Sequence, residues 1–143
     1  MHAEVAVGWT HEIEELSPQE CWRLLGTVPV GRLVYVDSGA PVAHPVNFVK
    51  AGADVIIRTG PGGNLRAAER GDVVAFQTDE IDNTTRSGWS VLLTGRASVV
   101  QNVDDLVAVL EPYSRPWARG RGEHVLRVSG ERITGRRLNV KPA

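Results

Sequence analysis

The sequence predicts a mainly β domain, a small antiparallel β-barrel with short helices outside it. Short runs rich in β-branched and aromatic residues follow one another along the chain, separated by turns rich in glycine, proline and aspartate. Apolar residues recur at helical spacing in only a few short segments. About six antiparallel strands of this length tend to close into a barrel, because closure leaves no open edge.

The first expected element is a helix that begins in the segment LSPQE, residues 16–20. Ser17 can cap the free N–H groups, and Pro18 suits the first helical position. Glu20 stands where the acid of a capping box belongs. An apolar stripe follows, and Gly26 ends the helix.

Three strands linked by hairpins come next, over residues 30–37, 42–49 and 55–59. In the second of them, successive side chains point to opposite faces. One face carries Val42, His44, Val46 and Phe48, and the other carries Ala43, Pro45, Asn47 and Val49.

A glycine-rich turn then leads into a short helix over 64–70, which Gly71 ends. Within the long strand that follows later, Gly95 interrupts an apolar face and predicts a bend or bulge. The remaining expected elements are strands over 72–80 and 89–101, a helix over 103–113, and a closing pair of strands over 124–130 and 132–138.

Length and composition favour one ordinary domain. The 143 residues are expected to form a single domain, 1–143, with 1–15 as a flexible N-terminal segment. Sixteen basic and seventeen acidic residues give a net charge of −1, so bulk charge indicates neither nucleic acid nor membrane as a partner. No run approaches the roughly 20 apolar residues that span a bilayer, and the acidic N-terminus does not resemble a signal peptide. We therefore expect a cytoplasmic protein.

Familiar catalytic motifs are missing from the sequence. The four histidines are scattered and the only cysteine is Cys21, so neither a zinc site nor an intramolecular disulfide is expected. Cys21 can be a structural thiol or a nucleophile, and we favour the structural interpretation. His44 is interpreted as a structural histidine of the barrel rather than a catalytic one. The segment RPWARGRG, 115–122, could stack on a planar ring, but a solvated loop is the simpler interpretation.

The segment RTGPGGNLRAAER, residues 58–70, is the best candidate for chemistry. Its glycines let the backbone approach an anion closely, and the helix that follows offers free N–H groups. Arg58 adds a fork of donors. The same residues would also make an ordinary turn, so the segment alone leaves both interpretations open.

Three stretches together resemble a known family. They are LSPQECWRLLGTVPVGRLVYVDSGAPVAHPVNFV, VIIRTGPGGNLRAAERGDVVAFQTDEID and GWSVLLTGRASVV, with a weaker echo in ERITGRRL. This order is similar to the pyridoxamine 5′-phosphate oxidase-like flavin-binding split barrels, in their small actinobacterial and nitroimidazole-reductase-like branch. The resemblance implies a six-stranded antiparallel split β-barrel that forms a homodimer and binds two flavins in clefts between the subunits.

The resemblance also implies a set of cofactor-binding residues. It assigns Arg58, Thr59, Gly63 and Asn64 to the flavin phosphate, Pro45, Val46 and Asn47 to the neighbourhood of the isoalloxazine ring, and Trp89, Ser90 and Val91 to the cleft. Relatives usually carry a lysine at the position of Asn64. An asparagine can donate hydrogen bonds but brings no charge, so phosphate affinity must depend on Arg58 and the helix N-terminus.

Our leading functional hypothesis is an FMN-dependent oxidoreductase that acts on a small molecule. No catalytic residue is assigned, because the flavin carries the hydride chemistry and the protein supplies binding and orientation. Pyridoxamine phosphate oxidation itself is not expected, since the chain is short and lacks the usual arginine- and histidine-bearing substrate motif. The alternatives are a reductase that uses the deazaflavin coenzyme and a non-enzymatic cofactor-binding protein.

Overall fold

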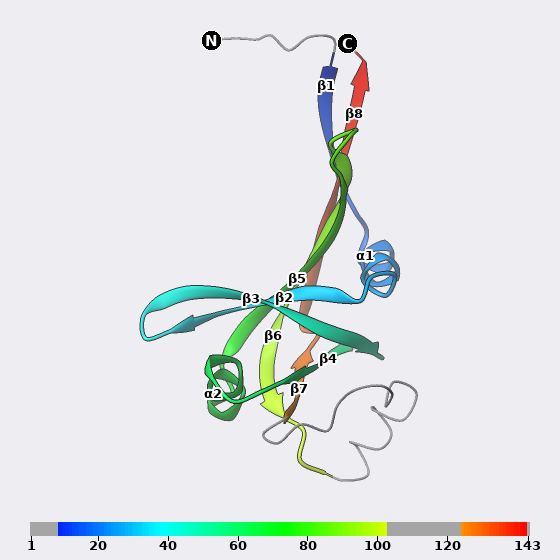
Figure 1. Ribbon diagram of the computed structural model, residues 1–143. Coiled ribbons are helices and arrows are strands. Elements are labelled where there is room, and N and C mark those ends of the chain that lie inside the picture. Colours follow the sequence, from blue (N-terminus) through cyan, green and yellow to red (C-terminus); the bar gives the residue numbers. More distant parts are fainter. Residues whose placement is uncertain (1–8, 103–123, 143) are drawn as a thin grey trace.

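The computed structural model of the protein describes residues 9–102 and 124–142 (Figure 1). These residues form two helices, α1 (Pro18–Leu25) and α2 (Gly63–Arg70). The strands are β1 (Trp9–Glu15), β2 (Val30–Asp37), β3 (Ala40–Ala51), β4 (Asp54–Thr59), β5 (Val73–Asp82), β6 (Ser87–Val99), β7 (His124–Ser129) and β8 (Arg132–Pro142). The helix expected over 103–113 and the arginine-rich segment 115–122 lie outside the described residues.

Six of the strands close into an antiparallel barrel, as predicted. Their order is β6-β5-β2-β3-β4-β7, and a further pairing of β6 with β7 completes the ring. β6 can do this because it pairs with β8 along its first half and with β7 along its last residues. Gly95 lies at the change of partner, where a Cβ atom would collide with the carbonyl oxygen of Ser129. The predicted irregularity at Gly95 is therefore a close approach of two backbones.

A strand that the sequence analysis did not predict extends the sheet beyond the barrel. Residues 9–15 of the expected N-terminal segment form β1, which pairs with β8 from Trp9 opposite Pro142 to Glu15 opposite Arg136. Together with β8 and the neighbouring ends of β5 and β6, β1 forms an arm that projects from the barrel (Figure 1). β1 begins and β8 ends at the far end of this arm.

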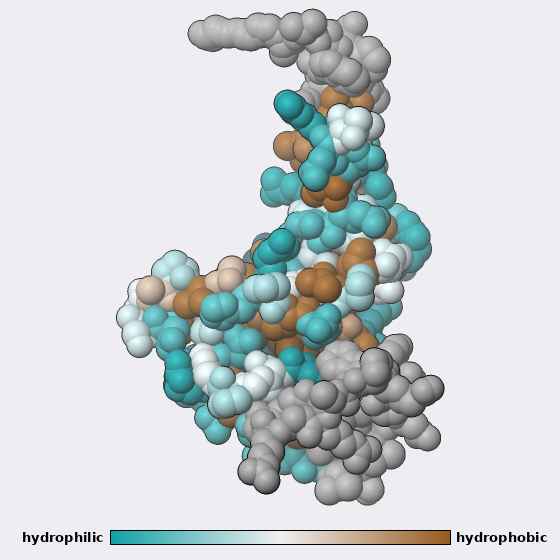
Figure 2. All heavy atoms as spheres, viewed as in Figure 1, coloured by the Kyte–Doolittle hydropathy of each residue, from teal (hydrophilic) through white to brown (hydrophobic). Residues whose placement is uncertain are grey.

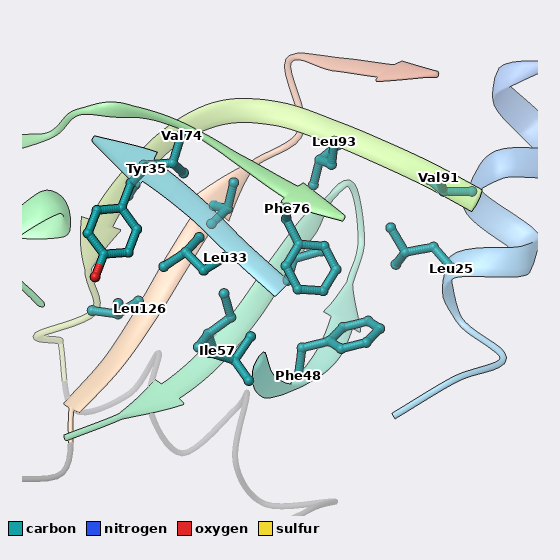
Figure 3. Packing of buried hydrophobic residues seen from close by; sticks show 14 of the residues in the cluster. Leu25, Leu33, Tyr35, Phe48, Ile57, Val74, Phe76, Val91, Leu93 and Leu126 are labelled. Atoms are coloured by element: carbon teal, nitrogen blue, oxygen red, sulfur yellow. The ribbon is translucent and has the colours of Figure 1, made fainter. Parts of the chain in front are cut away.

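The barrel interior is a continuous apolar core (Figure 3). Phe76 lies at its centre with no exposed surface, and its ring meets Phe48 edge-on at a centroid distance of 4.6 Å. Gly31 faces Phe76 from β2, and a Cβ atom there would collide with the phenyl ring. The alternation predicted for β3 is confirmed, since Val46 and Phe48 are buried whereas their neighbours are half-buried or exposed.

Two predictions about single side chains need correction. His44 does lie on the barrel-facing side of β3, but it is exposed, because the β2–β3 hairpin extends beyond the barrel (Figure 1). Its ring lies 6.0 Å from that of Tyr35 between centroids. The carboxylate of Glu20 accepts hydrogen bonds from Arg23 and Arg137, so it serves an ion-pair cluster and not a capping box.

Cys21 lies on the buried face of α1 and has no exposed surface. Desolvation by burial raises the pKa of its thiol, and the nearby Glu20 acts in the same direction. The thiolate is the reactive form of cysteine, so this environment disfavours nucleophilic chemistry. The position agrees with the structural interpretation.

Replacing Ser17 by alanine should lower the free energy of unfolding by about 1 kcal/mol. Ser17 is the N-cap of α1, and its Oγ accepts the N–H of Glu20 at 3.1 Å. Urea unfolding of the two proteins measures the difference. Ser98→Ala, at an exposed serine of β6, is the matched control and should change stability by less than about 0.5 kcal/mol. Equal losses in both variants would show that Ser17 does not act as a cap.

Candidate functional site

The N-terminus of α2 follows the end of β4 after a short glycine-rich loop. The chain leaves β4 at Thr59, passes through Gly60–Pro61–Gly62 and enters α2 at Gly63. The N-cap residue Gly62 has φ 141°, a backbone conformation that favours glycine, and no side chain caps the helix. The first turn contains no acidic residue. Among the described residues, nothing lies within 4 Å of a Cβ atom built on Gly60 or Gly62, so these two positions have free space beside them.

Asn64 joins this first turn to β4. Its Nδ2 donates to Thr59 Oγ1 at 3.2 Å, while its Oδ1 is buried without a hydrogen-bond partner. A buried amide oxygen without a partner is unfavourable. The reversed amide would accept the Thr59 hydroxyl through Oδ1 and place Nδ2, a donor, at the same buried position. The predicted pair Thr59 and Asn64 is thus brought together, with polar capacity left over.

Gly63 is required by its neighbour Tyr35. A Cβ atom on Gly63 would collide with the phenol oxygen of Tyr35 and lie 3.0–3.1 Å from two ring carbons. Tyr35 belongs to β2, so this contact joins α2 to the opposite part of the barrel. The resemblance assigned Gly63 to the phosphate and implied no role for Tyr35.

The arginines around the loop differ in their surroundings. Arg66 Nη2 lies 3.2 Å from Asp37 Oδ2, and Arg70 Nη2 lies 2.8 Å from Asp72 Oδ2. Both carry carboxylate partners and are exposed. Arg58 is half-buried on β4, opposite Val125 of β7, one residue before the strand ends. Arg58 is thus the arginine placed at the start of the loop itself.

The six other predicted residues fall into two groups. Pro45 and Asn47 on β3 are exposed, and Ser90 on β6 is half-buried on the outer side of the sheet, where it lines an open groove of about 900 Å³. The other three side chains belong to the core, with exposures of 8% for Val46, 5% for Trp89 and 1% for Val91. Side chains alternate along a strand, so these three can reach a ligand only through their backbones.

Within the chain, the phosphate candidates and Ser90 are not brought together. Continuing the β3–β4 register by one residue from the pair Phe48–Ile57 places Asn47 opposite Arg58. Ser90 instead pairs with Asp79 of β5 and Arg136 of β8, at the start of the projecting arm. The predicted residues thus form two separate sets within the chain.

The described residues hold neither a metal cluster nor a membrane-spanning helix. No group of three or more histidine, cysteine, aspartate or glutamate side chains is placed to share an ion in 9–102 and 124–142. In the same part of the chain, no helix is long and apolar enough to cross a bilayer.

Known proteins share both the sequence and the fold. Residues 17–137 match the sequence model of a family described as pyridoxamine 5′-phosphate oxidase. The chain belongs to this family. An uncharacterised protein from Mycobacterium tuberculosis is 34% identical over 132 residues, covering 89% of this chain and 86% of the relative.

Solved structures agree with this assignment. A FAD-binding protein from Mycobacterium smegmatis is 32% identical with a TM-score of 0.66, over 88% of this chain and 98% of that one. A FAD-binding protein from Mesorhizobium loti, 23% identical, shares the fold with a TM-score of 0.74 over 91% and 99% of the chains. The resemblance to the pyridoxamine 5′-phosphate oxidase family, stated from the motifs, is confirmed.

Proposed function

We propose that this member of the pyridoxamine 5′-phosphate oxidase family binds a flavin nucleotide, FMN or FAD, and acts as an oxidoreductase. The observation that carries the proposal is the open N-terminus of α2, uncapped by any side chain, free of acidic residues in its first turn and next to Arg58. Such a terminus favours a bound phosphate through its N–H groups and its dipole. The FAD-binding relative from Mycobacterium smegmatis supports the same ligand class.

The residues of the site suit a flavin phosphate. The N–H groups at the start of α2, the guanidinium of Arg58 and the amide of Asn64 would hold it. Pro45 and Asn47, exposed on β3 beside Arg58, would flank the ring. A bound flavin supplies the hydride chemistry, so the chain needs only to bind it, orient it and leave room for a small-molecule substrate.

The absorbance spectrum of freshly purified protein tests this proposal. A flavin spectrum, or the appearance of one after incubation with FMN or FAD and removal of free ligand, is the expected result. A colourless protein that takes up only the deazaflavin coenzyme would replace the flavin with that cofactor. A protein that retains none of them would favour a non-enzymatic barrel and contradict the proposal.

We also propose that the protein is a homodimer whose protomers meet through the outer side of the sheet. Residues that are paired across neighbouring strands point to the same side of a sheet. One such row crosses the outer side and consists of Pro45 on β3, Arg32 on β2, Gln77 on β5, Leu92 on β6 and Thr134 on β8. All large hydrophobic side chains that are exposed among the described residues lie on this side by the same alternation. They are Ile13, Val30, Val36, Val73, Ile81 and Leu92.

The outer side combines exposed apolar side chains with charged groups of both signs, so the outer sides of two copies of the chain can face each other. Arg32 donates to Gln77, which donates to Asp79, so a basic and an acidic group lie among the apolar side chains. An isologous interface requires this kind of self-complementarity. Hydrophobic side chains also appear on the arm and on the body in the space-filling view (Figure 2). A dimer of this kind can bring Ser90 of one protomer towards the phosphate candidates around Arg58 of the other protomer.

Introducing a charge at Leu92 should separate the protomers. Leu92→Arg places a guanidinium in the middle of the outer side, where a dimer would have to desolvate its charge. Sedimentation at micromolar concentration should show a dimer for the parent and a monomer for the variant. Ala53→Arg, in the exposed β3–β4 turn, is the control and should stay dimeric. A monomeric parent, or a Leu92→Arg dimer, would contradict the proposed interface.

A further inference from the structure

Tyr35 carries a hydroxyl group that the protein leaves without a hydrogen bond at the N-terminus of α2. Only 4% of the residue is exposed, and its ring is part of the barrel core. The phenol oxygen nevertheless lies against Gly63, the first residue of α2. Among the described residues, no hydrogen bond to this oxygen is formed. Figure 3 shows Tyr35 at the margin of the apolar cluster, at the end away from Leu25.

The phenol oxygen itself is not fully buried, although the ring is, so a ligand at the start of α2 can reach it. The N–H groups at the start of α2 are donors, so they cannot accept a hydrogen bond from the hydroxyl. A ligand that accepts hydrogen bonds from the helix start could accept one from Tyr35 as well. Tyr35 can donate this hydrogen bond because a neutral phenol carries an O–H group.

The surroundings keep this hydroxyl protonated and fixed in place. Desolvation raises the pKa of Tyr35 and Asp37 adds to the effect, while Arg66 opposes it. The ion pair between Arg66 and Asp37 also ties α2 to β2, the strand that carries Tyr35. On the other side of the helix start, Asn64 is bonded to Thr59. The first turn of α2 is therefore held from both sides at a constant distance from the phenol.

We propose that Tyr35 is a phosphate-binding residue, whose hydroxyl donates to an oxyanion seated on the N-terminus of α2. The inference rests on the proposed function for the identity of the ligand, a flavin phosphate, and adds a donor from β2 to those from β4 and α2. Tyr35 also explains why Gly63 is a glycine. Any larger residue would push the helix start away from the hydroxyl.

Tyr35→Phe removes the hydroxyl and keeps the ring that packs against Gly63. Loss of one hydrogen bond to a charged group corresponds to roughly a 10- to 100-fold loss of affinity. FMN binding, followed by quenching of flavin fluorescence, should weaken by this factor. Riboflavin, which lacks the phosphate, should bind the parent and the variant equally. Ser98→Ala, which removes an exposed hydroxyl of β6, should leave both affinities unchanged.

A second measurement uses inorganic phosphate as the probe and needs no flavin. Amide ¹⁵N–¹H shifts of residues 62–65 should move as phosphate is added to the parent protein, at lower concentrations than in Tyr35→Phe. If the parent binds no flavin but shows this difference, the proposed function fails and the anion seat with Tyr35 stands. Equal weakening of FMN and riboflavin, an unchanged FMN affinity, or a phosphate titration that does not distinguish the two proteins would overturn the role of Tyr35.

Discussion

Phe76→Ala is expected to lower the free energy of unfolding by about 3–5 kcal/mol, the range for removing a large aromatic side chain from a core. Phe76 has no exposed surface, packs edge-on against Phe48 and fills the space above Gly31. A cavity at this point would lie between β2, β3 and β5, which together form half of the barrel.

Urea unfolding of the parent and the variant measures this loss. Val73→Ala, on the same strand but 55% exposed, is the control and should change stability by less than about 0.5 kcal/mol. A loss of less than 1 kcal/mol for Phe76→Ala would mean that Phe76 does not occupy the centre of the core.

Arg58→Ala is expected to weaken binding of FMN by about one to two decades. One charge-assisted hydrogen bond to a phosphate is worth roughly 1.5–3 kcal/mol, and Asn64 brings no charge to replace it. Riboflavin should bind nearly as before, because it lacks the phosphate. Asn64→Lys should have the opposite effect, because it adds a positive charge. It should raise the affinity for FMN and leave the affinity for riboflavin unchanged.

Titrations of both ligands by fluorescence quenching distinguish a phosphate contact from a general effect on the fold. Arg23→Ala is the matched control, since Arg23 is an exposed arginine of α1 that bonds with Glu20. It should leave both affinities as they are in the parent. If Arg58→Ala weakens the binding of FMN and of riboflavin by the same factor, Arg58 acts through the fold or through the isoalloxazine ring and does not contact the phosphate.

Local patterns were sufficient to predict the barrel strands. Alternation on β3 and the turn signals around it identified the buried face that carries Val46 and Phe48. The pattern was weaker at β1, where Ile13 is the single aliphatic side chain between charged residues, and that strand depends on pairing with β8 more than 120 positions away. The strand expected over 72–80 was predicted to end before the polar segment that follows it, yet β5 continues to Asp82 by pairing with β6.

The candidate site was less accessible to sequence reasoning. The motif and the resemblance identified the loop from Arg58 to Asn64, but consecutive residues were assigned to the cleft on strands whose sides alternate. Trp89 and Val91 are therefore in the core while Ser90 between them is not. Tyr35 was missed because its contact with Gly63 joins residues 28 positions apart, and alternation on β2 predicts only that its side chain is buried.

The proposed function requires that the N-terminus of α2 holds the phosphate of a flavin nucleotide. Side-by-side titration of the parent protein with FMN, FAD and riboflavin tests it most directly. Loss of all phosphate contacts should cost at least tenfold in affinity. The expected result is that FMN or FAD binds more tightly than riboflavin by that margin or more, and that competing inorganic phosphate narrows the gap. Equal affinity for riboflavin and both nucleotides, or no binding of any of them, would contradict the claim.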